Sequence, residues 1–472
     1  MVSSNGPDPG LSQFASNWWM RIASVRERLP LGALVGGETR PGPYPQPPMA
    51  SEIVVMKFGG TSVAEPDDIR RAARRIVGAR QEGKRVVAVL SARGKTTDEL
   101  VNMAHEVSNT PAAREMDMLL STGERISCAL CAMAIHDLGH NAISLTGSQA
   151  GIVTDSSHTK ARILDVRADR IRDALDEDRI VLVAGFQGVS GDSRDVTTLG
   201  RGGSDTTAVA IAAALGAEVC QIYTDVRGVF SADPRLVDNA RLLPFVSFEE
   251  MLEMAASGAR VLQLRSVEYA RNHNIRMECR SSFEDGPGTL VLSEQDTMER
   301  PSVTAVTHAE EARVTLTGLR DEPGIAGRVF GALADANVNV DMIIQNEPVS
   351  TDDKADLSFT VDADDLQAAS EALGGLDISE SVQTDDRVGK VSVVGAGMRS
   401  HPGVAAKVFR TLGENGINIE MIATSPIKIS CVIDADDIPS AVRALHEAFE
   451  LGSDAVRREE PTGAEHRPRV TP

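Results

Sequence analysis

The sequence predicts an α/β protein in two parts. A mostly parallel sheet domain is expected over residues 51–296, and two small α+β modules of βαββαβ form are expected over residues 312–385 and 386–457. From Ile53 to Leu292, short β-branched apolar runs alternate with helical patterns, which is typical of parallel strands covered by helices on both faces. A sequence unit then recurs once. At 472 residues, the chain is also too long for one ordinary core.

Several strands of the first part can be placed from these apolar runs. The helical pattern Ile69–Arg80 follows Pro66, which suits a first helical turn, and two acids that favour the positive end of the helix dipole. In such sheets ligands bind where loops leave the carboxyl ends of the strands. The candidate strands are Ile53–Phe58, Val86–Leu90, Ile143–Leu145, Ile180–Ala184 and Val219–Tyr223.

The second part contains an internal repeat. Pro323–Phe330 returns as Pro402–Phe409, and Asn339–Ile343 returns as Asn418–Ile422, both at the same offset (402 − 323 = 418 − 339 = 79). Duplicated modules after an enzyme-like domain indicate ligand sensing or dimer formation, although a purely structural pair is the alternative. The repeated helix is expected to bury Val329, Phe330 and Leu333 in the first copy and Val408, Phe409 and Leu412 in the second.

Composition excludes several classes of partner. The chain carries 48 Lys and Arg against 68 Asp and Glu, a net charge of −20 that repels nucleic acid and anionic membranes. No continuous apolar run is long enough to span a bilayer. Five cysteines are too few for a disulfide scaffold, and Cys128 with Cys131 is spaced for the buried face of one helix. We therefore expect a reducing, cytoplasmic compartment.

The two ends and one internal segment differ from the rest of the chain. Residues 1–50 end in the proline-rich Pro41–Pro48 and are predicted to be a disordered extension or the result of a mis-assigned start, with Met49 as the initiator. A secretory signal or a transit peptide is a weaker interpretation, because arginines interrupt the apolar stretch. Residues 458–472 are predicted to be a disordered tail, and the polar segment Ser293–Ala312 a linker.

Two glycine-rich segments suit phosphate binding. In Lys57–Val63 a strand ends in a lysine and runs into Gly59 and Gly60, so backbone N–H groups and a point charge can approach an anion. In Gly200–Thr207 the glycines lead into a predicted helix Ala208–Leu215, where hydroxyls can donate hydrogen bonds. Arg201 can bind a carboxylate or a phosphate through its fork, while Asp205 suits the orientation of a cation, either Lys57 or Mg²⁺. A structural turn and a capped helix are the plain alternatives.

Three further segments are weaker alone. Ser91–Glu99 follows a strand and offers Thr97 or Asp98 as a helix N-cap. Glu124 lies at the start of an otherwise apolar helix, where an acidic side chain ordinarily serves only to interact with the helix dipole. Tyr223–Arg235 is a strand followed by a polar loop able to line an adenine and ribose site.

Taken together and in this order, these five segments resemble aspartate kinases of the amino acid kinase fold. The resemblance covers roughly residues 51–457 and includes two C-terminal modules similar to ACT domains, the amino-acid-sensing units of that family. It implies transfer of the terminal phosphoryl group of ATP to the side chain of L-aspartate, which yields ADP and 4-phospho-L-aspartate. This reaction is the first step toward lysine, threonine, methionine and diaminopimelate.

The resemblance also explains why no catalytic histidine is needed. An aspartate side chain has a pKa of about 3.9, so the nucleophile is already ionised at neutral pH. Charge neutralisation and in-line placement remain to be supplied. The resemblance implies that Lys57 lies against the transferring phosphoryl group and that Asp205 organises this lysine and Mg²⁺, with no direct side-chain metal ligand predicted.

Substrate and nucleotide contacts are likewise implied by the resemblance. Arg201 would bind a substrate carboxylate, Glu124 the α-ammonium group, and Thr97 and Ser204 would be hydrogen-bonding neighbours. Arg260 stands where the family has lysine. The implied nucleotide contacts are Lys57, Gly59, Gly60, Ser91, Thr224, Asp225, Phe230, Asp233, Pro234, Arg235 and Arg260.

The resemblance implies effector sites in the repeated modules. Such sites lie between modules, often from two chains, so we expect a homo-oligomer that responds to lysine, threonine or both. Some relatives also make this half as a separate small subunit, and Met298 would be the internal start. Ala423 and Pro426 stand where lysine-sensitive relatives carry Ser and Glu, which leaves the effector open. The matching positions are Asn339, Asp341, Gln345, Val404, Ala405, Asn418, Ile419 and Ser425.

Two other functions stay open at this point. One is another small-carboxylate kinase of the same fold, although this alternative does not account for Lys57–Val63 joined to two sensing modules. The other is a non-catalytic amino-acid sensor that has kept the kinase fold. The presence of Lys57, Arg201 and Asp205 argues against such a decayed site.

Overall fold

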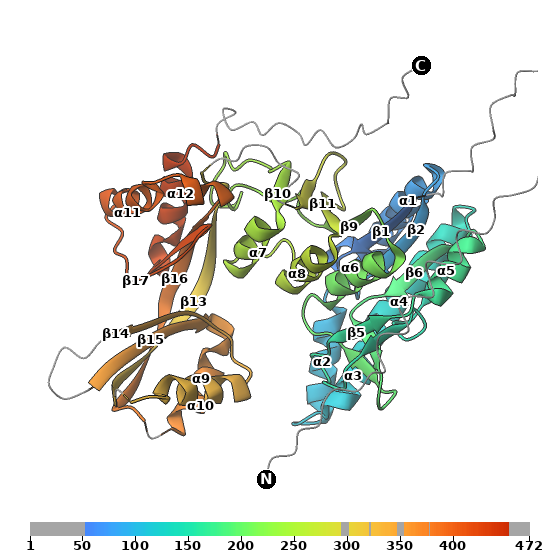
Figure 1. Cartoon of the computed structure of the whole chain (residues 1–472). Coiled ribbons are helices and arrows are strands. Elements are labelled where there is room, and N and C mark those ends of the chain that lie inside the picture. Colours follow the sequence, from blue (N-terminus) through green and yellow to red (C-terminus); the bar gives the residue numbers. More distant parts are fainter. Residues whose placement is uncertain (1–51, 294–301, 321, 347–353, 377, 453–472) are drawn as a thin grey trace, which may run out of the picture. The chain divides into compact units, whose positions relative to one another are not determined.

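The computed structural model describes residues 52–293, 302–320, 322–346, 354–376 and 378–452 (Figure 1). We call residues 52–293 the sheet domain and residues 302–452 the repeat half. The predicted extension, the predicted tail and Met298 lie outside the described residues.

The sheet domain is built on a mostly parallel sheet, as predicted. Within the described residues it has eight strands in the order β10-β12-β11-β9-β1-β2-β6-β3, and only the β11–β12 pair is antiparallel. The five predicted strands are all present, within one residue at each end. The strands are β1 (Ile53–Phe58), β2 (Arg85–Leu90), β3 (Ala142–Leu145), β6 (Ile180–Ala184), β9 (Val219–Thr224), β10 (Phe245–Ser247), β11 (Arg276–Ser281) and β12 (Thr289–Leu292).

Helices cover both faces of this sheet (Figure 1). Val54, Met56 and Phe58 of β1 pack against α1 (Pro66–Gln81) and α4 (Thr122–Asp137) on one face. On the other face the alternate strand residues pack against α5 (Asp169–Asp176), α6 (Gly203–Leu215), α7 (Phe248–Ala256) and α8 (Leu264–His273). Because strand side chains alternate in direction, Lys57 points to the same face as Val55, the face that α6 covers.

The sheet domain also contains a smaller sheet, whose strands come between β3 and β9 in the sequence. Within the described residues it has four strands, in the order β5-β4-β7-β8. The helices α2 (Thr96–Val107) and α3 (Ala113–Leu120) precede α4, and α3 packs against β8. The strands of this sheet are β4 (Ile152–Thr154), β5 (Ile163–Val166), β7 (Gln187–Ser190) and β8 (Val196–Thr198).

The repeat half forms one antiparallel sheet shared by both modules. Its six described strands run in the order β14-β15-β13-β16-β18-β17. Its strands are β13 (Ala305–Arg320), β14 (Val340–Asn346), β15 (Lys354–Asp362), β16 (Ser381–Val394), β17 (Met421–Ser425) and β18 (Lys428–Asp434). Its helices are α9 (Ile325–Asp335), α10 (Leu366–Gly374), α11 (Val404–Glu414) and α12 (Ile438–Ala448).

Each of the two long strands, β13 and β16, contributes to both modules. Ala305–Glu311 pairs with Val388–Val394 of the second module, whereas Arg313–Thr317 pairs with Ser381–Asp385 of the first. The fourth strand of the second module therefore comes from the start of β13, ahead of the first module in sequence. The boundary predicted between residues 385 and 386 falls inside the continuous strand β16.

The repeated helices bury the expected residues. Val329 and Leu333 on α9, and Val408 and Leu412 on α11, are each at most 1% exposed. The two phenylalanines at these positions, Phe330 and Phe409, are partly buried against the same clusters.

Three local predictions were wrong. The segment Ala305–Ala312, predicted as linker, is the first half of β13, where its backbone pairs with β16. Helix α6 begins at Gly203 rather than Ala208, so Ser204 and Asp205 lie inside it. Neither Thr97 nor Asp98 caps α2, because this helix already begins at Thr96 and its N-cap residue is Lys95.

One helical stretch, Ala113–Asp137, is long and apolar enough to cross a membrane by length and composition. Half of its most apolar window is buried inside the protein (50%), as in a core helix. Cys128 and Cys131 lie on its buried side, as their spacing predicted, and burial raises the pKa of Cys131 to about 12.

Candidate active site

The centre of the candidate site is an ion pair between two segments far apart in sequence. Lys57 Nζ on β1 lies 2.5 Å from Asp205 Oδ1 in the first turn of α6, and the two side chains are 11% and 7% exposed. Lys57 is level with Val89 of β2 and Ile222 of β9, one residue before the carboxyl end of its strand. The two predicted catalytic residues therefore meet at the edge where open α/β sheets bind ligands.

Gly59 and Gly60 let two loops approach closely beside this pair. A Cβ atom on Gly60 would lie only 2.9 Å from the carbonyl oxygen of Ala92, in the loop that follows β2. Arg93 of that loop donates to the carbonyl oxygen of Ala64 through Nη2 (2.6 Å) and Nε (3.0 Å). The segment after β1 and the segment after β2 are thus held together, and Ser91 lies at the start of the second segment.

Glu124 is a buried carboxylate that can accept a further hydrogen bond. Its side chain in the first turn of α4 accepts a hydrogen bond of 3.1 Å from the Ala92 backbone N–H through Oε1. Its Oε2 atom is buried and has no hydrogen-bond partner among the described residues. Burial raises the pKa of Glu124 to about 7, because the charged form loses water. A buried oxygen of this kind fits a cationic ligand group.

The remaining predicted substrate residues lie on separate elements. Ser204 in α6 is buried against Gly185, which follows β6, and a Cβ atom on that glycine would lie 2.7 Å from Ser204 Oγ. Arg201 is exposed in the turn before α6. Thr97 is half-buried near the start of α2, and a Cβ atom on Gly123 would lie 3.7 Å from Cγ2 of the preceding Thr96.

The predicted nucleotide residues fall into two groups. Thr224 ends β9 next to β1, and its hydroxyl donates to exposed Asp225 at 3.1 Å. The second group consists of Phe230, Asp233, exposed Pro234, Arg235 and Arg260. The contacts that the structure describes for these residues are not with Lys57. Asp233 binds Arg235 (2.7 Å) and His308 of β13 (3.3 Å), and chiefly the hydrogen bond from Arg235 lowers the pKa of Asp233 to about 2. Arg260 lies 3.9 Å from Asp362 of β15.

The loop of the second group is also part of the core of the repeat half. Ala232 and Val237 pack in one apolar cluster with Val391 of β16 and Leu445 of α12. Ser231 Oγ lies 2.9 Å from His446 Nε2, also on α12. A predicted nucleotide loop is therefore anchored on the second repeated module.

Two of the predicted effector residues make side-chain contacts, one within the repeat half and one with the sheet domain. Asp341 of β14 pairs with buried Lys390 of β16, which also pairs with Glu311. Ser425 of β17 donates a hydrogen bond of 3.0 Å to Glu253 on α7. Of the others, Asn339, Gln345, Ala405 and Asn418 are exposed, Ile419 is partly buried, and Val404 is buried in its module.

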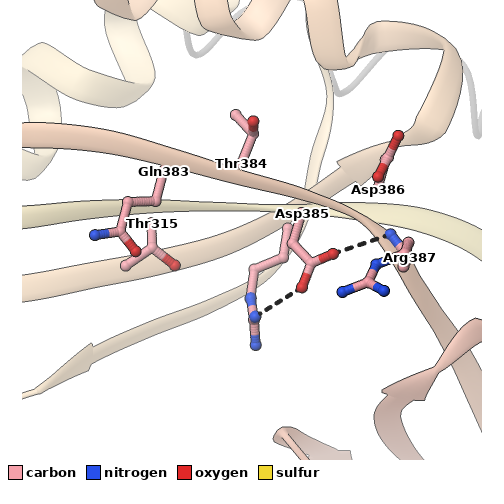
Figure 2. A pocket seen from close by; sticks show the side chains of 7 residues that line it. Thr315, Gln383, Thr384, Asp385, Asp386 and Arg387 are labelled. Carbon is pink, nitrogen blue, oxygen red and sulfur yellow. Dashed lines mark hydrogen bonds and ion pairs between the residues drawn. The ribbon is translucent and has the colours of Figure 1, made fainter.

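A polar hollow of about 370 Å³ lies on the shared sheet of the repeat half, and none of its lining residues was predicted as a site residue. In Figure 2, Asp385 lies at its centre, where it accepts hydrogen bonds from Arg313 (3.1 Å) and from the Arg387 backbone N–H (3.0 Å). Sequence reasoning did not single out this hollow, since its residues come from two strands about 70 residues apart. Its lining is Arg313, Thr315, Gln383, Thr384, Asp385, Asp386 and Arg387.

Sequence reasoning also missed four buried or bridging charges. Lys390 is 2% exposed; burial lowers its pKa, but the charges of Glu311 and Asp341 more than offset this and raise it overall. Asp117 on α3 is fully buried, and Glu253 bridges α7 to the repeat half. Glu250 accepts from Thr304 Oγ1 (2.5 Å) and the Ala396 backbone N–H (3.2 Å). Glu250 alone stands in a local motif, the capping box that it forms with Ser247 at the start of α7, and no local pattern identifies the distant partners of any of the four.

Comparison with known proteins first gives the class. The sequence profile of the amino acid kinase family matches residues 52–281, and an ACT domain profile matches residues 314–374 and 391–449. E. coli aspartokinase III solved with aspartate and ADP, in the R state, aligns with a TM-score of 0.71 at 26% identity, over 84% of this chain and 99% of that one. The fold and site thus define an amino acid kinase domain followed by ACT domains.

Sequence relatives then give the particular family. The aspartokinase of Mycolicibacterium smegmatis is 57% identical over 408 residues, covering 85% of this chain and 97% of that protein. The aspartokinase of Corynebacterium glutamicum is 53% identical over 408 residues, with the same coverage of 85% and 97%. The chain belongs to the aspartokinase family, and it is a phosphotransferase with a carboxyl group as acceptor.

Proposed function

We propose that the chain transfers the γ-phosphoryl group of ATP to the side-chain carboxylate of L-aspartate, giving ADP and 4-phospho-L-aspartate. The observation that carries this proposal is the 2.5 Å pair of Lys57 and Asp205 at the carboxyl edge of the sheet. A lysine held by a carboxylate is a fixed positive charge in a site that excludes most water. Such a charge stabilises the charge that develops on a transferring phosphoryl group.

The acceptor side is formed by Glu124 and Arg201. The unpartnered, buried Oε2 of Glu124 offers the α-ammonium group of aspartate a partner that water does not provide. The exposed guanidinium of Arg201 is free to grip a substrate carboxylate through two parallel hydrogen bonds. Thr97 and Ser204 would supply hydroxyl groups around the same ligand.

Magnesium fits this site as a companion of ATP. Among the described residues no cluster of three or more His, Cys, Asp or Glu side chains is placed to hold a metal ion. Mg²⁺ is commonly bound by one or two carboxylates together with substrate phosphates and water, so Asp205 beside the nucleotide phosphates suits it. When bound, the ion would neutralise charge on the phosphates. Lys57 and the Gly60 amide would then orient the γ-phosphoryl group, whereas the Gly59 N–H donates to the Tyr223 carbonyl oxygen at 3.2 Å.

Hydroxylamine trapping tests this function. The purified full chain with ATP, Mg²⁺ and L-aspartate should form an aspartyl hydroxamate, because hydroxylamine captures the labile acyl phosphate. Equal product from L-glutamate would favour another small-carboxylate kinase. No turnover with any amino acid would favour a non-catalytic sensor, which would overturn the proposal.

The repeat half supports regulation by amino acids. We infer that lysine, threonine or both bind at the positions matched in the two modules, and E. coli aspartokinase III solved with lysine and aspartate in the T state aligns at a TM-score of 0.68 with 27% identity. Asp341 and Ser425 already sit on contacts that lead out of their modules. Titration of activity with each amino acid, alone and together, identifies the effector.

The same proposal extends to assembly and pathway. A homo-oligomer in the cytoplasm, with or without a small subunit made from the repeat half, would catalyse the first step toward lysine, threonine, methionine and diaminopimelate. Size-exclusion chromatography with light scattering, with and without effector, measures the assembly. Mass spectrometry of protein from its native host shows whether Met298 starts a second product.

A further inference from the structure

We propose that Asp117 is a positioning residue for the aspartate site, which ties the element that carries Glu124 to the loop that carries Arg201. This inference rests on the proposed function, because it assumes that these two side chains bind opposite ends of one substrate. Asp117 is 0% exposed on α3, and no step of the proposed phosphoryl transfer uses it.

The carboxylate of Asp117 collects three donors from two distant segments. His158 Nδ1 lies 2.6 Å from Oδ2, and the Thr198 hydroxyl donates to Oδ1 at 2.6 Å. The Thr159 backbone N–H donates to both oxygens, at 3.0 and 3.2 Å. A carboxylate oxygen accepts hydrogen bonds, so an N–H on His158 Nδ1 would donate to Asp117 in this geometry. Four short contacts to one fully buried group form a network that few alternative geometries satisfy.

The Thr198 end of this network leads directly to Arg201. Thr198 closes β8, and Gly200 and Arg201 follow two and three residues later. Arg265 on α8 holds the same stretch by donating to the carbonyl oxygens of Leu199 (3.0 Å) and Ala161 (2.9 Å). Together with the backbone bonds of Thr198 and Leu199, one carboxylate and one guanidinium therefore hold the start of the Arg201 turn.

The loop bound by Asp117 also packs on this turn. Thr159 has a φ of 66°, a left-handed conformation that is costly for a β-branched residue. A Cβ atom on Gly200 would lie 3.1 Å from the Thr159 carbonyl oxygen. Asp117 thus holds a strained residue in contact with the glycine that precedes Arg201.

The other end of the network leads to Glu124. Helix α3 ends at Leu120 and α4 begins at Thr122, so Asp117 and Glu124 are fixed on adjoining helices. Gln187, which lies opposite Thr198 in the β7–β8 pair, donates to the Ser121 carbonyl oxygen at 2.8 Å. Gln187 and Thr198, neighbours on two paired strands, therefore both bind the α3–α4 region. These bonds set the spacing between Glu124 and Arg201.

Steady-state kinetics of Asp117→Asn test this role. The amide places an N–H group against one of the converging donors, so the Arg201 turn should shift while Lys57 and the nucleotide side stay in place. We expect the KM for aspartate to rise about 10-fold or more, with the KM for ATP and kcat each within about threefold of wild type. Thr198→Val, which removes one hydrogen bond at constant shape, should raise the same KM by a smaller factor.

A matched control separates positioning from folding. Ser392→Ala removes a buried hydroxyl pair with Ser430 (2.7 Å) in the repeat half, and it should leave the KM for aspartate unchanged. If Asp117 had only a structural role, its substitution would lower the fraction of active protein, which reduces the apparent kcat and leaves the KM for aspartate unaltered. A lower kcat with an unaltered KM in both Asp117→Asn and Thr198→Val overturns the inference. If Asp117→Asn does not fold, Thr198→Val decides alone. A wild-type chain that forms no hydroxamate defeats the proposed function instead.

Discussion

Ser425 in the second ACT module donates a hydrogen bond of 3.0 Å to Glu253 on α7 of the sheet domain. The other oxygen of Glu253 lies 3.0 Å from Lys428 Nζ, so one carboxylate on α7 holds both ends of the β17–β18 turn. An effector that contacts Ser425 would compete with this bond. The contact therefore offers a direct link between effector binding and the sheet domain.

Glu253→Gln should sensitise the chain to its effector and leave basal catalysis intact. The variant loses the ion pair with Lys428 and weakens the bond from Ser425 with which the effector competes, so we expect the half-inhibitory effector concentration to fall about 5- to 10-fold, at the low end of allosteric coupling. Activity titrations with lysine and threonine measure it. Glu106→Gln, an exposed acid on α2, is the control that should not shift the titration. An unaltered titration in Glu253→Gln would remove α7 from the route.

Lys57→Ala should abolish most turnover while aspartate still binds. Loss of a preorganised charge on the transferring group typically costs about 10²- to 10³-fold in kcat, and we expect a loss of at least that size with the KM for aspartate within about threefold. Hydroxamate assays over an aspartate series give both constants. Lys84→Ala, just before the opposite end of β2, should behave as wild type. Near-normal kcat in Lys57→Ala would refute the assigned role.

The pKa of Glu124, about 7, predicts the pH dependence of substrate capture. Glu124 is protonated below this value and can then no longer balance the α-ammonium charge of aspartate. We expect kcat/KM for aspartate to rise with pH, with a midpoint near pH 7, and to level above it. In Glu124→Gln the inflection should be lost and KM should increase. A wild-type profile flat from pH 6 to 8 would contradict this assignment.

The same burial predicts a gain of stability in Glu124→Gln without ligand. The folded-state pKa of about 7 lies above the ordinary 4.5, so the native state loses stability as pH rises from the lower value to the upper one. The glutamine variant lacks this penalty. Its advantage should grow between pH 5 and pH 8 and reach about 3 kcal/mol, which urea unfolding at the two pH values measures. An advantage independent of pH would mean that folding does not raise the pKa of Glu124.

Lys390→Met should destabilise the repeat half strongly. The substitution leaves the buried carboxylate of Glu311, 6% exposed, without its cation, and breaking such a buried pair costs about 3–5 kcal/mol. Adding Glu311→Leu should recover most of the loss, because the two apolar side chains can pack together. Urea unfolding followed by circular dichroism compares the three proteins. Equal stability of Lys390→Met and wild type would show that the pair contributes nothing.

The sequence predicts the fold well where one pattern repeats over several residues. Alternating apolar runs identify β1 with Lys57 at its end, and the register of the repeat identifies two modules. Ala305–Ala312 was misread as linker because its polar members Thr307 and Glu311 are buried against distant partners. The polar face of such a strand looks like a loop until its partner strand, some 80 residues on, is known.

The candidate site divides in the same way. Lys57, Gly59, Gly60 and Asp205 stand in glycine-rich segments whose chemistry is local, so their pairing could be expected. Asp117 reads as an ordinary helix acid, since its partners His158 and Thr198 lie 41 and 81 residues away. The buried trio around Lys390 escapes detection for the same reason: no spacing rule connects side chains that only the shared sheet brings together.

The packing of Ala232 and Val237 into the second ACT module has a consequence for any separately synthesised small subunit. A polypeptide that starts at Met298 lacks both residues, so one side of its apolar interior is left bare to water. Such a fragment would be stabilised by docking onto a full-length chain or by covering the bare side with another copy of itself. On its own in solution, it should be poorly soluble.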